Sequence, residues 1–162
     1  MNQFCSLLAI SLCFPFIPIH RHLGGRLQLE HPNVVKLLGV CFELRPWLAV
    51  LEIMIYGDVR KVLRACGQKR LALTESERLI ILSQACSGME FIASKGFVHM
   101  DIAARNMLIH TNNVVKIADF GITKKMDPET KTFALSGFLR LAVRWLAPGE
   151  CSAECRAWVR GG

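Results

Sequence analysis

The sequence has no uninterrupted run of about 20 apolar residues, the length that a helix needs to cross a membrane. Its most apolar stretch, residues 4–19, is shorter, and Pro15 and Pro18 interrupt it. As a secretion signal it lacks a basic leading region and a small-residue cleavage site. We therefore favour a segment that belongs to no fold, in a cytoplasmic protein without membrane association. The alternative is a signal or anchor, which would make the protein membrane-proximal.

Runs of lysine and arginine interleaved with aromatic residues are also lacking. The net charge is +7, from 20 Lys and Arg against 13 Asp and Glu. Such a balance suits nucleic acid, an anionic membrane face or a phosphate-rich ligand. Because the basic residues are scattered along the chain, the sequence argues against nucleic-acid binding.

A disulfide framework is lacking as well, because the seven cysteines are odd in number and irregularly spaced. Cys151 and Cys155 are four residues apart, but no second Cys or His pair follows to complete a zinc site. We expect reduced thiols in an intracellular protein. Apolar residues make up 52% of the chain, which is enough for a buried core.

Beyond residue 26 the pattern is that of a globular chain with mixed helices and strands. Strands are predicted from short β-branched apolar runs, and helices from three- and four-residue apolar spacing. The predicted elements are the end of a helix before Pro32, strands over 34–41 and 47–53, a short helix over 57–65, a long helix from 74 to 95, and strands over 107–109 and 114–117. Asn112-Asn113 joins the last two strands as a hairpin, because Asn tolerates positive φ.

The long helix has the clearest signals. Thr74 and Glu77 form a capping box, and Gly96 ends the helix in the left-handed conformation. An apolar stripe at three- and four-residue steps is predicted to be buried. Its members are Leu79, Leu82, Cys86, Met89 and Ala93.

Three polar residues around the hairpin point to chemistry. Asp101 lies on a loop, Asn106 follows five residues later, and Asp119 begins an Asp-Phe-Gly sequence after the second strand. Phosphoryl transfer requires one carboxylate that accepts a hydroxyl proton, and a second carboxylate and an amide oxygen that hold magnesium. Placing all three on loops around one hairpin fixes their separation.

These segments resemble the eukaryotic protein kinases, and the tyrosine kinases in particular. The family catalytic loop H-R-D-L-A-A-R-N is similar to HMDIAARN over residues 99–106. The resemblance implies Asp101 as catalytic base, Asn106 as a magnesium ligand and Asp119 as the main magnesium ligand. It implies that Arg105 neutralises the transferred phosphate and admits a tyrosine side chain, and that His99 packs structurally under Phe120.

The resemblance runs from about residue 27 to residue 150. HPNVVKLLGVC is similar to the junction between the small-lobe helix and the next strand, and WLAVLEIM is similar to the strand that leads into the hinge. It implies Leu51 as gatekeeper, backbone groups of Glu52 and Met54 that bind adenine, and Leu108 as the adenine floor. The implied ligands are ATP and Mg²⁺, with a protein tyrosine as substrate.

The implied fold is α+β and protein-kinase-like. We expect part of the N-terminal lobe, namely the end of its helix and two strands, and the upper half of a mainly helical C-terminal lobe. The expected division is an unassigned segment over residues 1–26, a partial kinase domain over 27–150 and an unassigned tail over 151–162.

The sequence departs from the family pattern in several places. No G-x-G-x-x-G and no V-A-I-K occur, and His22 stands where the small-lobe helix has its Glu. Met100 replaces the Arg that reads a phosphorylated activation loop. In agreement with that loss, residues 122–141 contain no tyrosine, and Tyr56 is the only one in the chain. Gly149 displaces Glu150 from the expected Ala-Pro-Glu.

Three interpretations follow. The first is a tyrosine-type protein kinase of which this chain is an incomplete record. The second is a pseudokinase that binds partners or nucleotide without catalysis, and the third is a fragment that does not fold alone. We expect the 162-residue chain to transfer phosphate slowly or not at all, because the parts that cover and pair the phosphates are missing from its sequence.

Overall fold

The computed structural model describes residues 8–11, 29–41, 43, 48–130, 132–133 and 155–156. Its elements, in chain order, are β1 (Leu8–Ser11), β2 (Leu37–Cys41), β3 (Leu48–Leu51), β4 (Gly57–Asp58), α2 (Val59–Gln68), α3 (Glu75–Ser94), β5 (Phe97–Val98), the 3-10 turn η1 (Ala104–Asn106), β6 (Met107–Ile109), the 3-10 turn η2 (Thr111–Asn113), β7 (Val115–Ile117), β8 (Lys124–Lys125), β9 (Thr132–Phe133) and β10 (Cys155–Arg156). The predicted mixture of helices and strands is confirmed.

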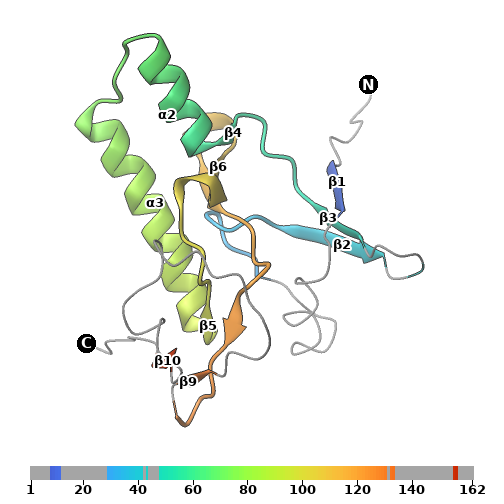
Figure 1. Ribbon diagram of the computed structural model, residues 1–162. Helices are drawn as coiled ribbons and strands as arrows, with labels where there is room; N and C mark the ends of the chain where they lie inside the picture. The colour runs from blue at the N-terminus through green and yellow to red at the C-terminus, as the bar shows by residue number, and fades with distance from the viewer. Residues whose placement is uncertain are drawn as a thin grey trace.

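The two strands predicted before the first helix pair in one antiparallel sheet of order β1-β3-β2. β2 and β3 lie on the opposite side of the molecule from α3 in Figure 1. The outer strand β1 comes from the N-terminal segment that we expected to lie outside the fold, and its four residues pair with β3 from Leu8↔Leu51 to Ser11↔Leu48. This pairing was not visible in the sequence.

The hairpin of β6 and β7 is confirmed, with Met107↔Ile117 at one end and Ile109↔Val115 at the other. The turn between them places Asn112 at φ 58° and Asn113 at φ 56°, the left-handed region that Asn tolerates. β4 adds a third strand on the β6 side. Because Met107 pairs with Ile117, the two loops that carry the predicted chemistry leave the same end of this small sheet, opposite the Asn turn.

The short helix α2 begins two residues later than predicted and ends three residues later. Asp58 is its N-cap, and its Oδ1 accepts a hydrogen bond from the Lys61 N–H at 2.8 Å. Gly57 precedes it at φ +71°, a conformation that suits glycine. These two residues form β4 instead of the first helical turn, so the hairpin sheet runs directly into α2.

The long helix α3 begins and ends as predicted. Thr74 Oγ1 accepts from the Glu77 N–H at 3.2 Å, and the Glu77 carboxylate accepts from the Thr74 N–H at 2.7 Å, which completes the capping box. Gly96 follows at φ +76° and donates to the Ala93 carbonyl at 2.9 Å. The signals at both ends are local, which is why the sequence located them.

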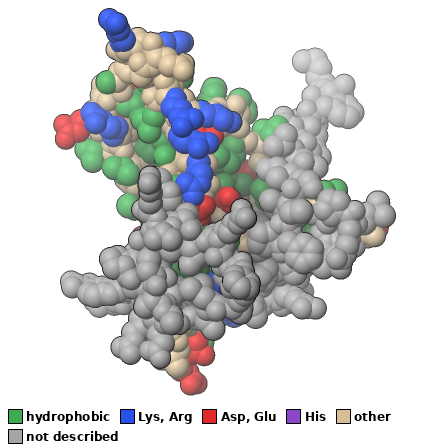
Figure 2. Space-filling model, viewed as in Figure 1, with side chains coloured by type: hydrophobic (Ala, Val, Ile, Leu, Met, Phe, Trp, Pro, Cys, Tyr) green, Lys and Arg blue, Asp and Glu red, His purple; other side chains and the backbone are tan. Residues whose placement is uncertain are grey.

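The prediction of a buried apolar stripe on α3 is wrong for the first three of its five members. Leu79 is 59% exposed, Leu82 is 53% exposed, and Cys86 is also exposed. The residues that are buried are Ala85, Gly88 and Ile92. Successive residues in a helix are about 100° apart, so the true buried line lies one residue away from the predicted one. Figure 2 shows hydrophobic side chains exposed on the part of the surface that α2 and α3 form.

The core is where α3 packs against the hairpin and the loop before β2. The buried cluster consists of Val34, Ala85, Ile92, Phe97, Ile117 and Phe120. A second cluster under α2 consists of Val59, Ile109 and Val115. Because Ile117 and Phe120 flank Asp119 in sequence, the core fixes the loop that carries this carboxylate.

Some predictions fall outside the described residues. These are His22, Gly149 and Glu150, most of the tail over residues 151–162, and the part before Leu29 of the helix predicted to end before Pro32. Residues 29–31 are described and are not helical, so the prediction is wrong for the end of that helix. Within that tail, β10 pairs with β9.

Gly88 is the closest approach between α3 and the loop before β2. A side-chain carbon placed on Gly88 would lie 2.4 Å from the Asn33 carbonyl oxygen and 3.1 Å from Ile117 Cγ1. That carbonyl already accepts from the Ile117 N–H at 2.9 Å, so it cannot move freely. We expect Gly88→Ala to lower the free energy of unfolding by about 1–3 kcal/mol, as overpacking in a core does, measured by urea unfolding.

Gly67→Ala is the matched control, because Gly67 lies in α2 with nothing within 4 Å of the new carbon. We expect it to be neutral or to stabilise by up to about 1 kcal/mol through helix propensity. Equal effects of the two substitutions would contradict the close packing at Gly88.

Candidate active site

The turn from His99 to Asn106 brings together the predicted base and a predicted metal ligand. Asn106 is buried, and its Nδ2 donates to Asp101 Oδ2 at 2.8 Å and to the Asp101 carbonyl oxygen at 2.7 Å. Arg105 Nη2 donates to Oδ1 of the same carboxylate. Both carboxylate oxygens of Asp101 thus accept a hydrogen bond within the turn, which fixes the orientation of this side chain.

The neighbours of Asn106 determine which way its amide faces. The two groups that meet Nδ2 are a carboxylate and a carbonyl, and both are acceptors, so the nitrogen must occupy this side of the amide. Oδ1 is then the atom left for a donor or a cation. The backbone of Asn106 is held too, because its N–H donates to the Ala103 carbonyl and its carbonyl accepts from the Ala118 N–H, both at 2.8 Å.

Asp119 lies beside this turn because the residue before it is hydrogen-bonded to Asn106. It has φ +64° and is exposed, and its Oδ1 accepts from the Gly121 N–H at 3.4 Å. Phe120, the next residue, is buried and anchors the loop in the core. The structure therefore brings Asp101, Asn106 and Asp119 onto adjoining loops.

His99 has the structural role expected of it. It is fully buried, and its ring meets that of Phe120 edge-on, with centroids 5.1 Å apart. Nδ1 accepts from the Asp101 N–H at 3.3 Å, so the ring proton lies on Nε2 and is donated to the Ala118 carbonyl at 3.0 Å. Burial lowers the pKa of His99, against the opposing effects of the Ala118 carbonyl and the nearby Asp119 and Asp101 carboxylates.

Met100 occupies the position where the family pattern has an arginine. The side chain is buried, and the backbone has φ +67°, a region that a residue with a side chain adopts at a cost of about 1–3 kcal/mol. The surrounding turn is held instead by the hydrogen bonds of Asp101 with Arg105 and Asn106. Met100 thus contributes apolar packing beside the base.

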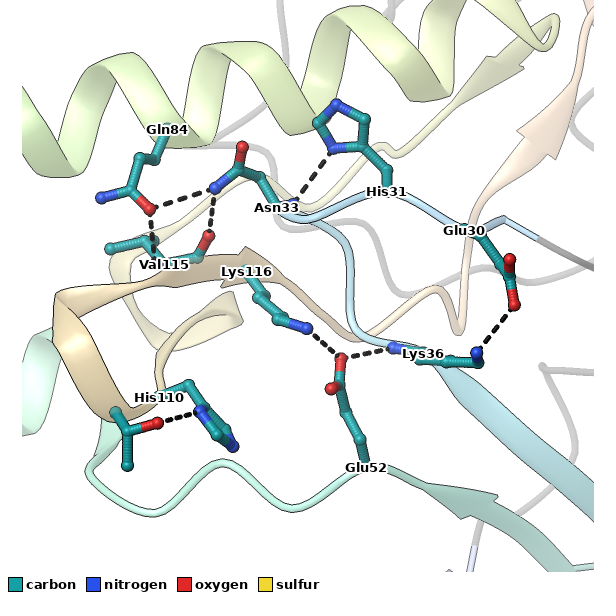
Figure 3. A network of polar contacts seen from close by, with 10 residues as sticks. Glu30, His31, Asn33, Lys36, Glu52, Gln84, His110, Val115 and Lys116 are labelled. Carbon is teal, nitrogen blue, oxygen red and sulfur yellow. Dashed lines mark hydrogen bonds and ion pairs between the residues drawn. The ribbon is translucent and has the colours of Figure 1, made fainter.

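Glu52, predicted on the adenine side, joins three segments through its side chain (Figure 3). Its Oε1 accepts from Lys116 Nζ at 2.6 Å and from the Lys36 N–H at 2.8 Å. Its own N–H donates to the Lys36 carbonyl at 3.0 Å. The Lys116 and Glu52 side chains are only 16% and 22% exposed, so this ion pair ties the end of β3 to β7, the strand that leads to Asp119.

The other residues predicted on the adenine side lie close to this tie in the fold. Met54 begins the turn before β4, and its carbonyl accepts from the Gly57 N–H at 3.3 Å. Leu108 lies in the middle of β6, opposite Lys116 on one side and Asp58 on the other, and is half-buried. Leu108 thus lies in the sheet that leads out of the turn carrying Asp101, and Met54 is hydrogen-bonded to the first residue of its strand β4.

A second polar network fixes the hairpin to α3 (Figure 3). Gln84 Oε1 accepts from Asn33 Nδ2 at 3.1 Å and from the Val115 N–H at 2.9 Å, and Asn33 Nδ2 also donates to the Val115 carbonyl at 2.9 Å. Gln84 Nε2 donates to the Asn113 carbonyl at 3.0 Å. One buried asparagine and one glutamine therefore fix the position of β7 along the axis of α3.

The roles of Lys116 and Gln84 in these networks were not predicted from the sequence. Both residue types are common on exposed surfaces, and neither stands in a motif with a mechanism. For Lys116, alternation along β7 offers a weak signal, because it separates the buried Val115 and Ile117 and so faces the opposite side of the strand. Gln84 has no local signal, because its partners are 31 and 51 residues away.

Among the described residues no group of three or more His, Cys, Asp and Glu side chains is placed to hold a metal ion. The part of the chain that the structure describes also contains no helix long and apolar enough to span a membrane.

The lowered pKa of His99 predicts a pH dependence of stability. The unfolded state takes up the proton first, near pH 6.5, so the free energy of unfolding should fall as the pH drops below that value, at a limiting slope of about 1.4 kcal/mol per pH unit for one proton. The slope should end below the folded-state pKa. Urea unfolding between pH 7.5 and 5 measures it.

Nitrogen chemical shifts of the imidazole rings give an independent measurement. We expect His99 in the folded protein to be more than half neutral at pH 6.5, with the proton on Nε2, because its pKa is lowered from that value. His110→Gln, which removes a half-buried histidine paired with Thr111, is the control and should leave the slope unchanged. A His99 ring that is mostly protonated at pH 6.5 would contradict the assignment.

Removal of the Lys116 ammonium should weaken the tie at Glu52. Lys116→Met leaves the poorly exposed carboxylate with fewer donors, and we expect a loss of about 1–2 kcal/mol in the free energy of unfolding. Lys36→Met is the control, because Lys36 pairs with Glu30 where both side chains are half exposed, while its backbone N–H still reaches Glu52. Little change is expected there, and similar losses in both variants would contradict a special role for Lys116.

Comparison with known proteins agrees with the geometry. A family profile described as protein tyrosine and serine/threonine kinase matches residues 22–158. The transforming tyrosine-protein kinase Abl of Abelson murine leukemia virus is 38% identical over 139 residues, covering 83% of this chain and 18% of that protein. The BDNF/NT-3 growth factors receptor of Gallus gallus is 38% identical over 138 residues, with 80% and 17% covered.

Tyrosine-protein kinase Fer of Homo sapiens is 35% identical over 139 residues, with 83% of this chain and 16% of that protein covered. The chain thus spans less than a fifth of the length of these relatives. The profile covers most of the sequence, and within it lie the catalytic turn, the hairpin and the Asp119 loop. On this evidence the chain belongs to the protein tyrosine and serine/threonine kinase family.

Proposed function

We propose that this chain carries the active site of a tyrosine-type protein kinase, which transfers the γ-phosphoryl group of Mg-ATP to a protein tyrosine. The observation that supports this most directly is the buried Asn106, whose side chain holds the Asp101 carboxylate and whose carbonyl holds the strand end before Asp119. One residue thus sets the distance between a base and a metal-binding carboxylate.

Asp101 is the proposed general base. The phenolic proton of the substrate tyrosine passes to its carboxylate as the oxygen attacks phosphorus. Hydrogen bonds from Arg105 and Asn106 orient this carboxylate, and each oxygen keeps a further lone pair for the substrate hydroxyl. Arg105 is partly exposed beside the base, and we propose that its guanidinium also neutralises the transferred phosphate.

Asn106 and Asp119 are the proposed magnesium ligands. The donor set fits, because Asn106 Oδ1 faces away from the acceptors that fix Nδ2, and Asp119 is exposed with a carboxylate that is only weakly held. An amide oxygen and a carboxylate suit Mg²⁺, which takes its remaining ligands from phosphate oxygens and water. When bound, the metal neutralises phosphate charge.

The adenine base is proposed to meet the segment between β3 and β4. The Glu52 N–H already donates to the Lys36 carbonyl, and the Met54 carbonyl already accepts from the Gly57 N–H. The Glu52 carbonyl and the Met54 N–H are the complementary acceptor and donor, two residues apart, that we assign to adenine. Leu108 on β6 is the proposed floor beneath the ring, and Leu51, the last residue of β3, the gatekeeper.

The substrate class rests on two arguments. The relatives at 35–38% identity include proteins named as tyrosine-protein kinases, and Arg105 stands four residues after the base, as in the resemblance noted above. A cytoplasmic location is part of the proposal. Its support is the free thiols of Cys41, Cys66 and Cys86 and the dependence of the reaction on ATP.

A catalytically silent binding module is the second candidate. The observation that favours it is that Arg105 and Asn106 already occupy one acceptor site on each oxygen of Asp101. Met100 also favours this candidate, because the family pattern has an arginine at its position and the turn therefore lacks that guanidinium. The first candidate predicts nucleotide binding and transfer, whereas the second predicts binding of partners or of nucleotide without transfer.

Two substitutions separate binding from chemistry. Asp119→Asn should abolish the magnesium-dependent part of the thermal shift that ATP produces, measured as the difference between Mg-ATP and ATP with EDTA. Asp101→Asn should keep that shift and lower the rate of tyrosine-peptide phosphorylation by about 10²–10⁴-fold, the usual contribution of a general base. We expect the rate of the 162-residue chain itself to be low.

Glu129→Gln is the matched control, because Glu129 is an exposed carboxylate on the loop after β8. It should change neither measurement. An unchanged magnesium-dependent shift in Asp119→Asn would contradict the metal assignment. Nucleotide binding without any Asp101-dependent transfer would favour the silent binding module.

A further inference from the structure

Tyr56 is the only tyrosine in the chain, and it lies at the tip of the turn between β3 and β4. Its side chain is 57% exposed, and so is that of Ile55 at 58%. The backbone of the turn is held by hydrogen bonds from the Tyr56 N–H to the Ile109 carbonyl at 3.1 Å and from the Gly57 N–H to the Met54 carbonyl at 3.3 Å. Its phenol is therefore accessible, on a segment that few bonds restrain.

Basic side chains surround the backbone next to Tyr56. Lys61 folds back over Gly57, so that a side-chain carbon on Gly57 would lie 4.0 Å from Lys61 Nζ. That ammonium is 3.6 Å from Asp58 Oδ2, and Arg60 Nε is 3.9 Å from Asp58 Oδ1. Asp58 is the one acid of this group, and it is mostly buried as the N-cap of α2.

The charge of α2 is uniformly positive beyond its cap. Arg60, Lys61 and Arg64 lie on the helix, and Lys69 and Arg70 follow it, without an acidic residue among them. Figure 2 shows Lys and Arg side chains gathered over this part of the molecule. A phosphotyrosine carries a charge of about −1.5 to −2 at pH 7, so a phosphate on Tyr56 would enter a basic surface in which Asp58 is the one acid that pairs with Lys61 and Arg60.

We propose that Tyr56 is a phosphorylation site, modified by a second copy of this chain, and that Lys61 and Arg60 bind the phosphate. The inference rests on the proposed kinase function. It names the one tyrosine among these 162 residues, and it places that residue at the segment assigned to adenine. Regulation through a tyrosine in residues 122–141 is excluded by composition.

The step balances as an ordinary phosphoryl transfer. Tyr56 Oη of one copy forms a bond to the γ-phosphorus of ATP bound by the other copy. The bond between that phosphorus and the oxygen bridging the β- and γ-phosphates breaks, and ADP leaves with the electron pair. The phenolic proton passes to the Asp101 carboxylate of the copy that acts as enzyme.

A mixing experiment tests the site. The enzyme copy carries Tyr56→Phe and therefore has no tyrosine, and the substrate copy carries Asp101→Asn and therefore lacks the base. With Mg-ATP, any phosphotyrosine in the mixture must be on Tyr56 of the substrate copy, transferred between molecules. Because the rate of the 162-residue chain is expected to be low, the mixture is followed over hours, and we expect a phosphotyrosine signal that rises with time and that mass spectrometry locates on Tyr56.

A random Glu–Tyr copolymer offered to the same enzyme copy distinguishes the two levels of the proposal. Phosphorylation of the copolymer without phosphorylation of Tyr56 overturns the site and leaves the kinase function standing. If neither the copolymer nor Tyr56 is phosphorylated, both the kinase function and the transfer between copies are overturned. Phosphorylation of both, and none of a substrate copy that carries Tyr56→Phe and Asp101→Asn, supports both.

The role of Lys61 is tested on phosphorylated protein. Phosphorylation should raise the Tm of the substrate copy at low salt, and Lys61→Met should remove at least half of this rise. Lys69→Met is the matched control, because it removes the same charge about 12 Å further along the helix axis and should keep the rise. Equal effects of the two substitutions would overturn Lys61 as the phosphate ligand.

Discussion

The hydrogen bonds of Asn106 are the constraint on which the rest of this structure depends. Its side-chain amide holds the Asp101 carboxylate, and its carbonyl accepts the Ala118 N–H, one residue before Asp119. Because the residue is buried, these bonds are not shared with water and keep a narrow geometry. One residue thus joins the turn that carries Asp101 to the strand end before Asp119.

The frame around Asn106 comes from residues far away in the chain. The Asn33 and Gln84 side chains fix β7 against α3, and Gly88 lets the loop at Asn33 approach the helix closely. Below Asp119, His99 donates to the Ala118 carbonyl while Phe120 fills the core. Asp119 is exposed, whereas Asn33, His99 and Phe120 are buried and Gln84 is half-buried. An exposed group on a buried frame combines access with rigidity.

Glu52 connects this frame to the strand on the other side of the proposed nucleotide site. Its carboxylate joins Lys116 on β7 to the backbone of Lys36, so the segment assigned to adenine is bonded to the strand that leads to Asp119. Tyr56 and Lys61 lie just beyond that segment, where the chain turns into α2. A charge added at this turn would act on the same sheet through β4.

The sequence alone determined the local features, because each depends on neighbours a few residues away. These are the capping box of α3, the Asn turn of the hairpin, and the resemblance that named Asp101, Arg105, Asn106 and Asp119. The buried face of α3 and the β1 strand were not determined locally. The tertiary structure decided them, since burial depends on which face meets Val34 and Ile117 and strand pairing depends on a partner about 40 residues away. For the same reason the roles of Lys116 and Gln84 could not be predicted, because their hydrogen-bond partners are distant in the sequence.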